Sequence, residues 1–179
     1  LEAARTKESI QMLEEAQYDV FRLWYAIPIR EMVTSPSFQE DAVWIARAMQ
    51  PRITAGEAQH ALDLLLQVGL LGRDADGKLV LKDTKLGTPR NGRSIAMRRY
   101  HRQLMEFAID ALDQLPPTQR HVSGVTFRLS ESQYELVTQL IEQFRFDLCD
   151  IIEDAPQPVD AQKVYQVVME LFPLSHVVR

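Results

Sequence analysis

The sequence predicts an α+β, mainly helical protein in which a winged-helix-like module precedes a long helix and a small strand-helix-strand layer. Three observations favour this fold. Apolar residues recur at helical spacing along much of the 179-residue chain. An Asp-Gly turn separates two short apolar runs, and β-branched runs flank a late helical segment. We therefore divide the chain into an N-terminal amphipathic helix (1–33), the winged-helix-like module (34–82) and a regulatory region with a helix and the strand-helix-strand layer (83–179).

The first helix is expected over about residues 5–27, as a linker or dimer contact. Its apolar residues alternate three and four positions apart, which is coiled-coil-like spacing: Leu13, Ala16, Val20, Leu23 and Ile27. Aromatic residues crowd the same segment, and such residues usually serve a core or an interface. Pro28 is expected to bend or end this helix because proline lacks a backbone donor.

Two capping boxes begin the helices expected in the winged-helix-like module, Ser37 with Glu40 and Thr54 with Glu57. The first of these helices is expected to stop near Pro51. The second is expected to begin one residue after its cap and to end at a glycine, followed by a hairpin around an Asp-Gly turn.

The second of these helices would be the recognition helix of a winged helix-turn-helix, yet it contains no lysine or arginine. Its outer face instead offers Glu57, Gln59, His60, Asp63 and Gln67. Such a surface should not attract phosphate, because affinity for nucleic acid depends largely on basic side chains.

Positive charge is concentrated after this helix. Residues 78–102 hold eight basic residues and one acidic residue, a net +7, so the overall charge of −5 leaves −12 on the rest of the chain. This asymmetry favours an anionic partner. The alternative is a solvated face paired with acidic neighbours, for which Arg102 and Glu106 have suitable spacing.

Two binding hypotheses follow from the charge. A small anionic, nucleotide-like ligand would have its phosphates clamped by Arg98, Arg99 and Arg102 beneath a basic loop that contains Arg90 and Arg93. Nucleic acid would instead be bound through the wing and this loop by Lys78, Lys82, Lys85, Arg90 and Arg93.

A long helix is expected over about residues 94–115, ended by two prolines. One seam repeats at spacings of four and three: Met97, His101, Leu104, Ala108, Ala111 and Leu115. This seam places His101 on the buried side, where a histidine is usually a hydrogen-bonded core residue rather than a ligand or a pH sensor.

The last third of the chain predicts the strand-helix-strand layer. Residues 122–129 and 164–172 have the β-branched content of strands. Between them Ser130 and Gln133 form a third capping box, which begins a helix running to about Glu153. The single cysteine, Cys149, lies in the apolar pattern of this helix and is expected to be buried.

Motifs for catalysis and for metal binding are missing from the sequence. It contains no nucleophile elbow, phosphate-binding glycine loop or zinc-protease motif, and its four histidines never stand three or four residues apart. We therefore expect a protein that is not an enzyme and that holds no cofactor and no metal. The lack of an apolar run of about 18 residues and of a signal peptide predicts a cytoplasmic chain without a membrane partner.

Several segments together resemble a bacterial domain family of unassigned function. They are Ile53 to Leu79, Arg99-Tyr100-His101-Arg102-Gln103-Leu104, Arg120 to Thr126, Phe144-Arg145, Val164-Tyr165-Gln166 and Leu171-Phe172-Pro173-Leu174. In that family the domain follows a helix-turn-helix in transcriptional regulators. The resemblance implies the C-terminal region of such a regulator, so that DNA is a partner of the full-length protein rather than of this fragment, which begins at Leu1. It adds Tyr100 and His101 to the candidate ligand-binding residues and brings no catalytic residue.

These observations lead to one principal hypothesis about function. We expect a non-enzymatic regulatory and dimerisation region of a bacterial transcriptional regulator, present as a homodimer. Direct nucleic-acid binding and the sensing of a small anionic ligand are the alternatives.

Overall fold

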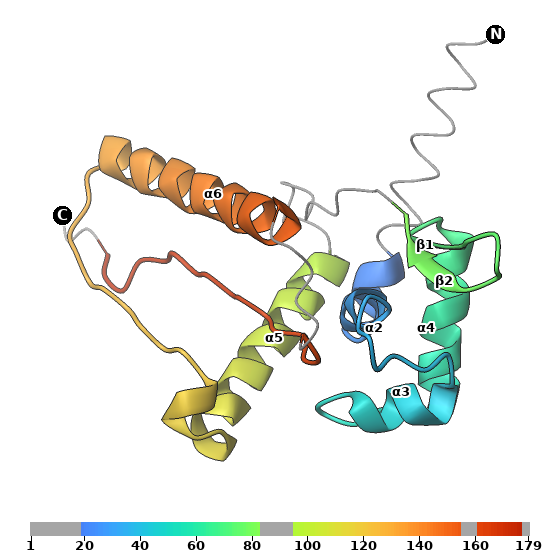
Figure 1. Cartoon of the computed structure of the whole chain (residues 1–179). Helices are drawn as coiled ribbons and strands as arrows, with labels where there is room; N and C mark the ends of the chain where they lie inside the picture. The colour runs from blue at the N-terminus through green and yellow to red at the C-terminus, as the bar shows by residue number, and fades with distance from the viewer. Residues whose placement is uncertain (1–18, 83–94, 155–160, 177–179) are drawn as a thin grey trace, which may run out of the picture. The chain divides into compact units, whose positions relative to one another are not determined.

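The computed structural model describes residues 19–82, 95–154 and 161–176 (Figure 1). In chain order its elements are α2 (Ala26–Met32), α3 (Ala42–Ala48), α4 (Ala55–Gln67), β1 (Leu71–Arg73), β2 (Leu79–Leu81), α5 (Ile95–Gln114), the 3-10 helix η1 (Pro117–Gln119) and α6 (Glu131–Asp154). β1 and β2 pair antiparallel, with Gly72 opposite Val80. The expected class, mainly helical with a small sheet, is confirmed.

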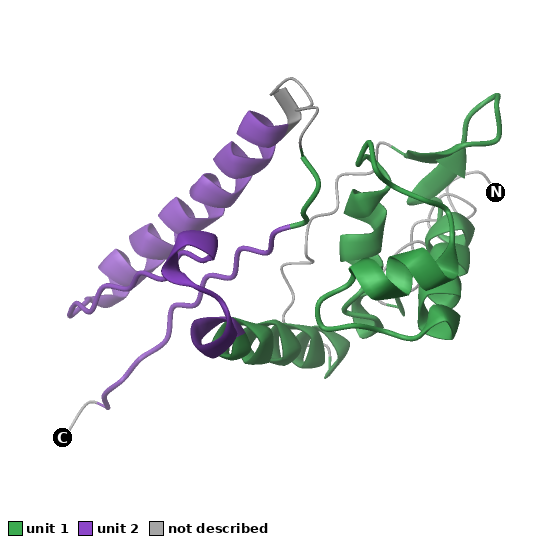
Figure 2. Ribbon diagram, turned by 60° about the horizontal axis from the view of Figure 1, so that its bottom comes forward, with its two compact units in different colours: residues 1–110, 160–164 green, residues 111–159, 165–179 purple. Residues whose placement is uncertain are grey.

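The chain forms two compact units (Figure 2). The first comprises residues 1–110 and 160–164, and the second comprises residues 111–159 and 165–179. The hydrophobic core lies in the first unit, and the second is built around α6.

The core of the first unit forms where α2, α3, α4 and the hairpin meet. α4 contacts α2, α3 and β1. Each of these elements supplies a fully buried side chain: Ile29, Ile45, Leu65 and Leu71. Two alanines of α4 are also fully buried, and small side chains allow neighbouring helices to approach closely.

Local sequence signals determine both ends of α4, as predicted. The Thr54 Oγ1 accepts a hydrogen bond from the Glu57 backbone N–H at 3.2 Å, and the Glu57 carboxylate accepts one from the Thr54 N–H at 2.8 Å. At the other end Gly69 has φ +72°, a left-handed conformation that glycine adopts without steric cost. The predicted helix start at Ala55 and the glycine stop are therefore confirmed.

The expected helix through Ile27 is wrong in its C-terminal part. Residues 19–22 are helical, residues 23–25 form a bend, and a separate helix, α2, begins at Ala26. Pro28 therefore lies in the first turn of α2 and does not end a helix. Proline fits there because the first backbone N–H groups of a helix have no acceptor within the helix. The earlier part of the predicted helix lies outside the described residues.

The predicted cap of α3 is also wrong. Asp41 caps this helix by accepting a hydrogen bond from the Trp44 backbone N–H at 2.6 Å, whereas the Ser37 hydroxyl lies 3.0 Å from that of Ser35. The carboxylate of Glu40 is bound instead by Arg73 of the hairpin. A tertiary ion pair has thus replaced the local capping box.

α5 occupies the predicted range, and its buried face includes Met97 and Leu104 of the predicted seam but not His101. Met97, Tyr100 and Leu104 are buried, and His101 is exposed, so the placement of His101 on the buried side is wrong. The reason is that Tyr100 packs edge-on against Phe21, with 5.3 Å between ring centroids. This aromatic contact turns the next residue outward.

In the second unit α6 and its capping box agree with the prediction, whereas the flanking strands do not form. The Ser130 N–H donates to the Gln133 side chain at 2.9 Å, and the Gln133 N–H donates to the Ser130 hydroxyl at 3.3 Å. Residues 121–130 and 161–173 are irregular. The preference of β-branched residues for strands depends on a neighbouring strand to pack against, and in the described part of the chain neither segment has one. The strand-helix-strand layer is therefore wrong, as is the burial of Cys149, which is exposed.

Candidate functional site

The first half of α5 presents a basic face made by Arg98, Arg99 and Arg102. All three side chains are exposed, as is His101. Among residues 19–82, 95–154 and 161–176, no carboxylate forms an ion pair with any of the three arginines. The expected pair between Arg102 and Glu106 does not form there either. These charges are therefore available to an external anion.

Tyr100, which lies between these arginines in the sequence, has a buried side chain. Its side chain is buried against Phe21, and its ring edge lies near His101, with 5.9 Å between centroids. Burial raises the pKa of the Tyr100 hydroxyl above its usual value because the phenolate would lose its hydration. Tyr100 therefore serves to orient α5, while the neighbouring arginines point toward solvent.

The basic residues predicted on the wing are only partly described. Lys78 and Lys82 are exposed on either side of β2, Lys78 in the turn and Lys82 at the open end of the hairpin. Lys85, Arg90 and Arg93 lie outside the described residues. The structure thus places two of the five proposed nucleic-acid contacts on one hairpin.

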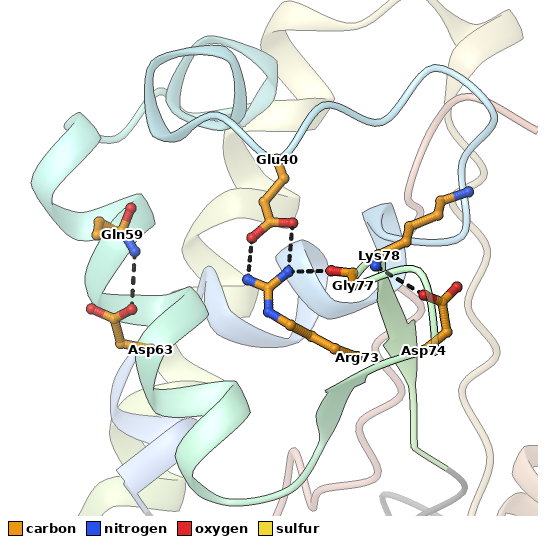
Figure 3. A network of polar contacts seen from close by, with 7 residues as sticks. All are labelled: Glu40, Gln59, Asp63, Arg73, Asp74, Gly77 and Lys78. Carbon is orange, nitrogen blue, oxygen red and sulfur yellow. Dashed lines mark hydrogen bonds and ion pairs between the residues drawn. The ribbon is translucent and has the colours of Figure 1, made fainter.

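An ion pair that the sequence reasoning missed fastens the hairpin to the segment before α3 (Figure 3). Both terminal nitrogens of Arg73 meet the carboxylate of Glu40, and Arg73 also donates to the Gly77 carbonyl at 2.6 Å. The hydrogen bonds from Arg73 hold the pKa of Glu40 below its usual value. Because its guanidinium group is already occupied, Arg73 is not part of the basic surface.

Arg30 is a second residue that sequence reasoning missed. Its side chain is only 11% exposed and pairs with Glu31, and its Nη2 donates to the Lys82 carbonyl at 3.4 Å. The contact ties α2 to the end of the hairpin across 52 residues. A partner this distant in sequence leaves no local signal, which is why the pattern did not reveal it.

The outer face of α4 is uncharged or acidic, as predicted. Gln59, His60, Asp63 and Gln67 are exposed, and Gln59 donates to Asp63 at 2.9 Å (Figure 3). The remaining residue of this face, Glu57, is engaged by the capping box, whose hydrogen bonds from Thr54 lower the pKa of its carboxyl. This face therefore presents no positive charge to a phosphate backbone.

One open hollow of about 320 Å³ lies beside the hairpin, lined by residues 33–36, Asp74 and residues 78–81. Lys78 is the only basic residue in its lining. Within the described ranges no three histidine, cysteine, aspartate or glutamate residues are grouped so that they could hold a metal ion. None of the described helices combines the length and the apolar character needed to cross a membrane.

The chain matches a known family model. The model of a family described as "Domain of unknown function (DUF4423)" matches residues 4–174. No curated protein and no solved structure matches the chain. The matched range includes the core of the first unit, the basic face of α5 and all of α6.

Proposed function

We propose that this chain, which belongs to the DUF4423 family of domains of unknown function, is the regulatory and dimerisation region of a bacterial transcriptional regulator and is not an enzyme. Its three helices and hairpin act as a winged-helix-like module used for packing or sensing. The protein is cytoplasmic, and DNA is read by another part of the full-length regulator.

The observation that carries this proposal is the amount of apolar side chain left exposed from α5 onward. Ile109 is 60% exposed, Leu140 59% and Phe144 51%, and further exposed apolar residues lie in residues 122–127 and 164–174. Large exposed apolar side chains that gather into patches usually mark interfaces in proteins, and α5 and α6 each carry several of them. Burying this surface between two copies supplies the driving force for a homodimer.

The surface of α4 supports the second part of the proposal. A recognition helix enters the major groove and is surrounded by phosphates, yet the outer face of α4 offers only neutral and acidic groups. DNA reading by α4 would bring Asp63 toward like charge. This helix is therefore better suited to a protein contact.

The oligomeric state of the chain at tens of micromolar tests the dimerisation proposal. Sedimentation equilibrium should give twice the 20.6 kDa of the chain. A clean monomer would refute this part of the proposal. Adding duplex DNA should leave the sedimentation unchanged at physiological salt, because α4 offers no phosphate contacts.

The unpaired arginines of α5 favour a second candidate function, the sensing of a small anionic, nucleotide-like ligand. Guanidinium groups bind phosphate oxygens bidentately, and Arg98, Arg99 and Arg102 have no competing ion pair among the described residues. A thermal-shift screen of nucleotides tests it, since a ligand at 100 times its dissociation constant stabilises by about 2.7 kcal/mol. The double variant Arg98→Glu/Arg102→Glu should lose the shift, and Arg47→Glu/Arg52→Glu should keep it. An equal response from both variants would reject this site.

Direct nucleic-acid binding through the wing is the remaining alternative, supported by the exposure of Lys78 and Lys82. Such binding must weaken steeply as salt rises, because each phosphate contact releases counterions. Fluorescence anisotropy of a labelled duplex at low and physiological salt tests it. Binding that Lys78→Glu/Lys82→Glu does not weaken would exclude the hairpin as the contact.

A further inference from the structure

α5 has a second seam, opposite its buried face. Met97, Tyr100 and Leu104 are buried. A row on the other side of the helix repeats at spacings of three and four: Ile95, Arg98, Arg102, Met105, Ile109 and Leu112. Every residue of this row is exposed, Ile95 to 73% and Ile109 to 60%, and we call the row the exposed seam of α5. The seam is basic in its first half and apolar in its second half.

α6 carries an exposed seam with the opposite charge. Leu136, Leu140 and Phe144 are followed on the same face by Asp147 and Ile151, and all five are exposed. Asp150 stands beside Ile151 and is exposed as well. The α6 seam is therefore apolar in its first half and acidic toward its C-terminus.

The two seams match when the helices run antiparallel. If Ile109 faces Leu140, then Met105 faces Phe144, four residues along on each helix. Three residues further, Arg102 faces Asp147, and after four more Arg98 faces Ile151 next to Asp150. The intervals are the same on both helices, with a rise of about 1.5 Å per residue. They therefore place two apolar pairs side by side, Arg102 opposite Asp147, and Arg98 opposite Ile151 with Asp150 as the adjacent acidic residue.

We propose that the exposed seam of α5 in one copy of this chain binds the exposed seam of α6 in a second copy, so that two identical α5–α6 contacts form a two-fold symmetric dimer. The proposal rests on the proposed dimerisation function and names the surface that performs it. A second copy is the occupant because it offers an α6 seam to α5 and an α5 seam to α6 at the same time, and the side chains of both seams are exposed.

Charge disfavours a parallel pairing of like helices. α6 contains seven acidic residues and one basic residue, so two parallel α6 seams in register would bring the two Asp147 carboxylates together. Two parallel α5 seams in register would likewise bring arginine to arginine. Like charges held together across an interface cost free energy and are used in proteins to suppress wrong partners, whereas the α5–α6 pairing places Arg102 opposite Asp147.

A charge-swap experiment tests the proposal. One variant of the full chain carries Arg98→Glu/Arg102→Glu, and another carries Asp147→Lys/Asp150→Lys. Each alone should be at least tenfold weaker as a dimer than the wild type in sedimentation equilibrium, because like charges then meet in both contacts. When the two variants are mixed, each reversed helix meets its opposite charge on the other chain. A heterodimer of wild-type affinity should therefore form.

Controls make each outcome decisive. Arg47→Glu/Arg52→Glu changes the net charge as much as the α5 reversal, but Arg47 lies on α3 and Arg52 follows it, both exposed and outside the two seams. This variant should dimerise like the wild type. Unchanged urea unfolding of each variant, followed by tryptophan fluorescence, shows that the first unit is folded.

Three results would overturn the pairing. If either variant alone keeps the wild-type dimer, the dimer uses another surface, and the proposed dimerisation function stands without this interface. If each variant alone is a monomer and mixing the two restores no dimer, α6 does not bind α5 of another chain. If the wild type is itself a monomer, the proposed dimerisation function fails together with this inference.

Discussion

Truncating Leu65 should destabilise the first unit more than any change on its surface. Leu65 is a fully buried core residue of α4, the helix that contacts α2, α3 and β1. Replacing a buried leucine by alanine costs about 2–5 kcal/mol, the loss of transfer free energy plus a term for the cavity left behind. Ile29 and Ile45 are fully buried as well, so the backbone of three elements would have to move for the site to collapse. We therefore expect about 3–4 kcal/mol for Leu65→Ala.

Urea unfolding monitored by tryptophan fluorescence measures this change well, because both tryptophans of the chain, Trp24 and Trp44, pack against the core of the first unit. With a urea dependence of about 1 kcal/mol per molar for a small domain, the midpoint should fall by about 3 M. Val43→Ala is the matched control, since Val43 is 46% exposed on α3 and its truncation should change stability by less than about 0.5 kcal/mol. A shift for Leu65→Ala no larger than that of Val43→Ala would refute the assignment of Leu65 to the centre of the core.

Three further predictions concern the ends of α4 and the hairpin. Thr54→Ala should lower the free energy of unfolding by about 1 kcal/mol through loss of the cap of α4. Thr138→Ala, within α6, is the control and should not lower the urea midpoint. Equal effects of the two substitutions would contradict the capping role of Thr54. Gly69→Ala should lower the free energy of unfolding by about 1 kcal/mol, because Gly69 has a left-handed φ of +72°. A Cβ at this position would meet no atom within 4 Å, so the loss would come from the backbone angle and not from a steric clash. Gly56→Ala, in the first turn of α4, should instead stabilise by about 0.5–1 kcal/mol, so thermal midpoints that move in the same direction would contradict the backbone assignment. The Arg73 hydrogen bonds lower the pKa of Glu40 in the folded protein. Their contribution to the free energy of unfolding is therefore fully present above the unfolded pKa of about 4.3, and it is lost as the pH falls through the lower pKa of the folded state. Both side chains are at least 40% exposed, which limits the contribution to about 0.5 kcal/mol. The difference in urea midpoint between the wild type and Glu40→Gln should therefore be present at pH 7 and shrink as the pH falls below the unfolded pKa of about 4.3. A difference that grows toward acid would contradict this role of Arg73.

Local interactions explain where sequence reasoning succeeded. The capping boxes of Thr54 with Glu57 and of Ser130 with Gln133 are made within four residues, and the stop at Gly69 depends on one dihedral angle. Such signals are complete in the sequence because both partners lie within one turn of the chain. The ranges of α4, α5 and α6 followed from them and from the apolar repeat.

Failures arose wherever a distant partner decided the outcome. Ser37 and Glu40 have the spacing of a capping box, but Arg73, 33 residues away, binds Glu40, and Asp41 caps α3 instead. The heptad spacing placed His101 on the buried side, but the contact of Tyr100 with Phe21 selected a neighbouring face. Residues 122–129 have the composition of a strand and remain irregular, since a strand exists only when a second one pairs with it.

The sequence by itself determined the ranges of α4, α5 and α6, the caps of α4 and α6, the hairpin turn and the uneven distribution of charge, because each depends on neighbouring residues or on composition. It also showed that α4 lacks the basic residues of a recognition helix. Only the tertiary structure decided which face of α5 is buried, and therefore that Arg98 and Arg102 lie on an exposed seam with Met105 and Ile109. Burial depends on which helix faces meet, and that choice is made by contacts between residues far apart in the chain.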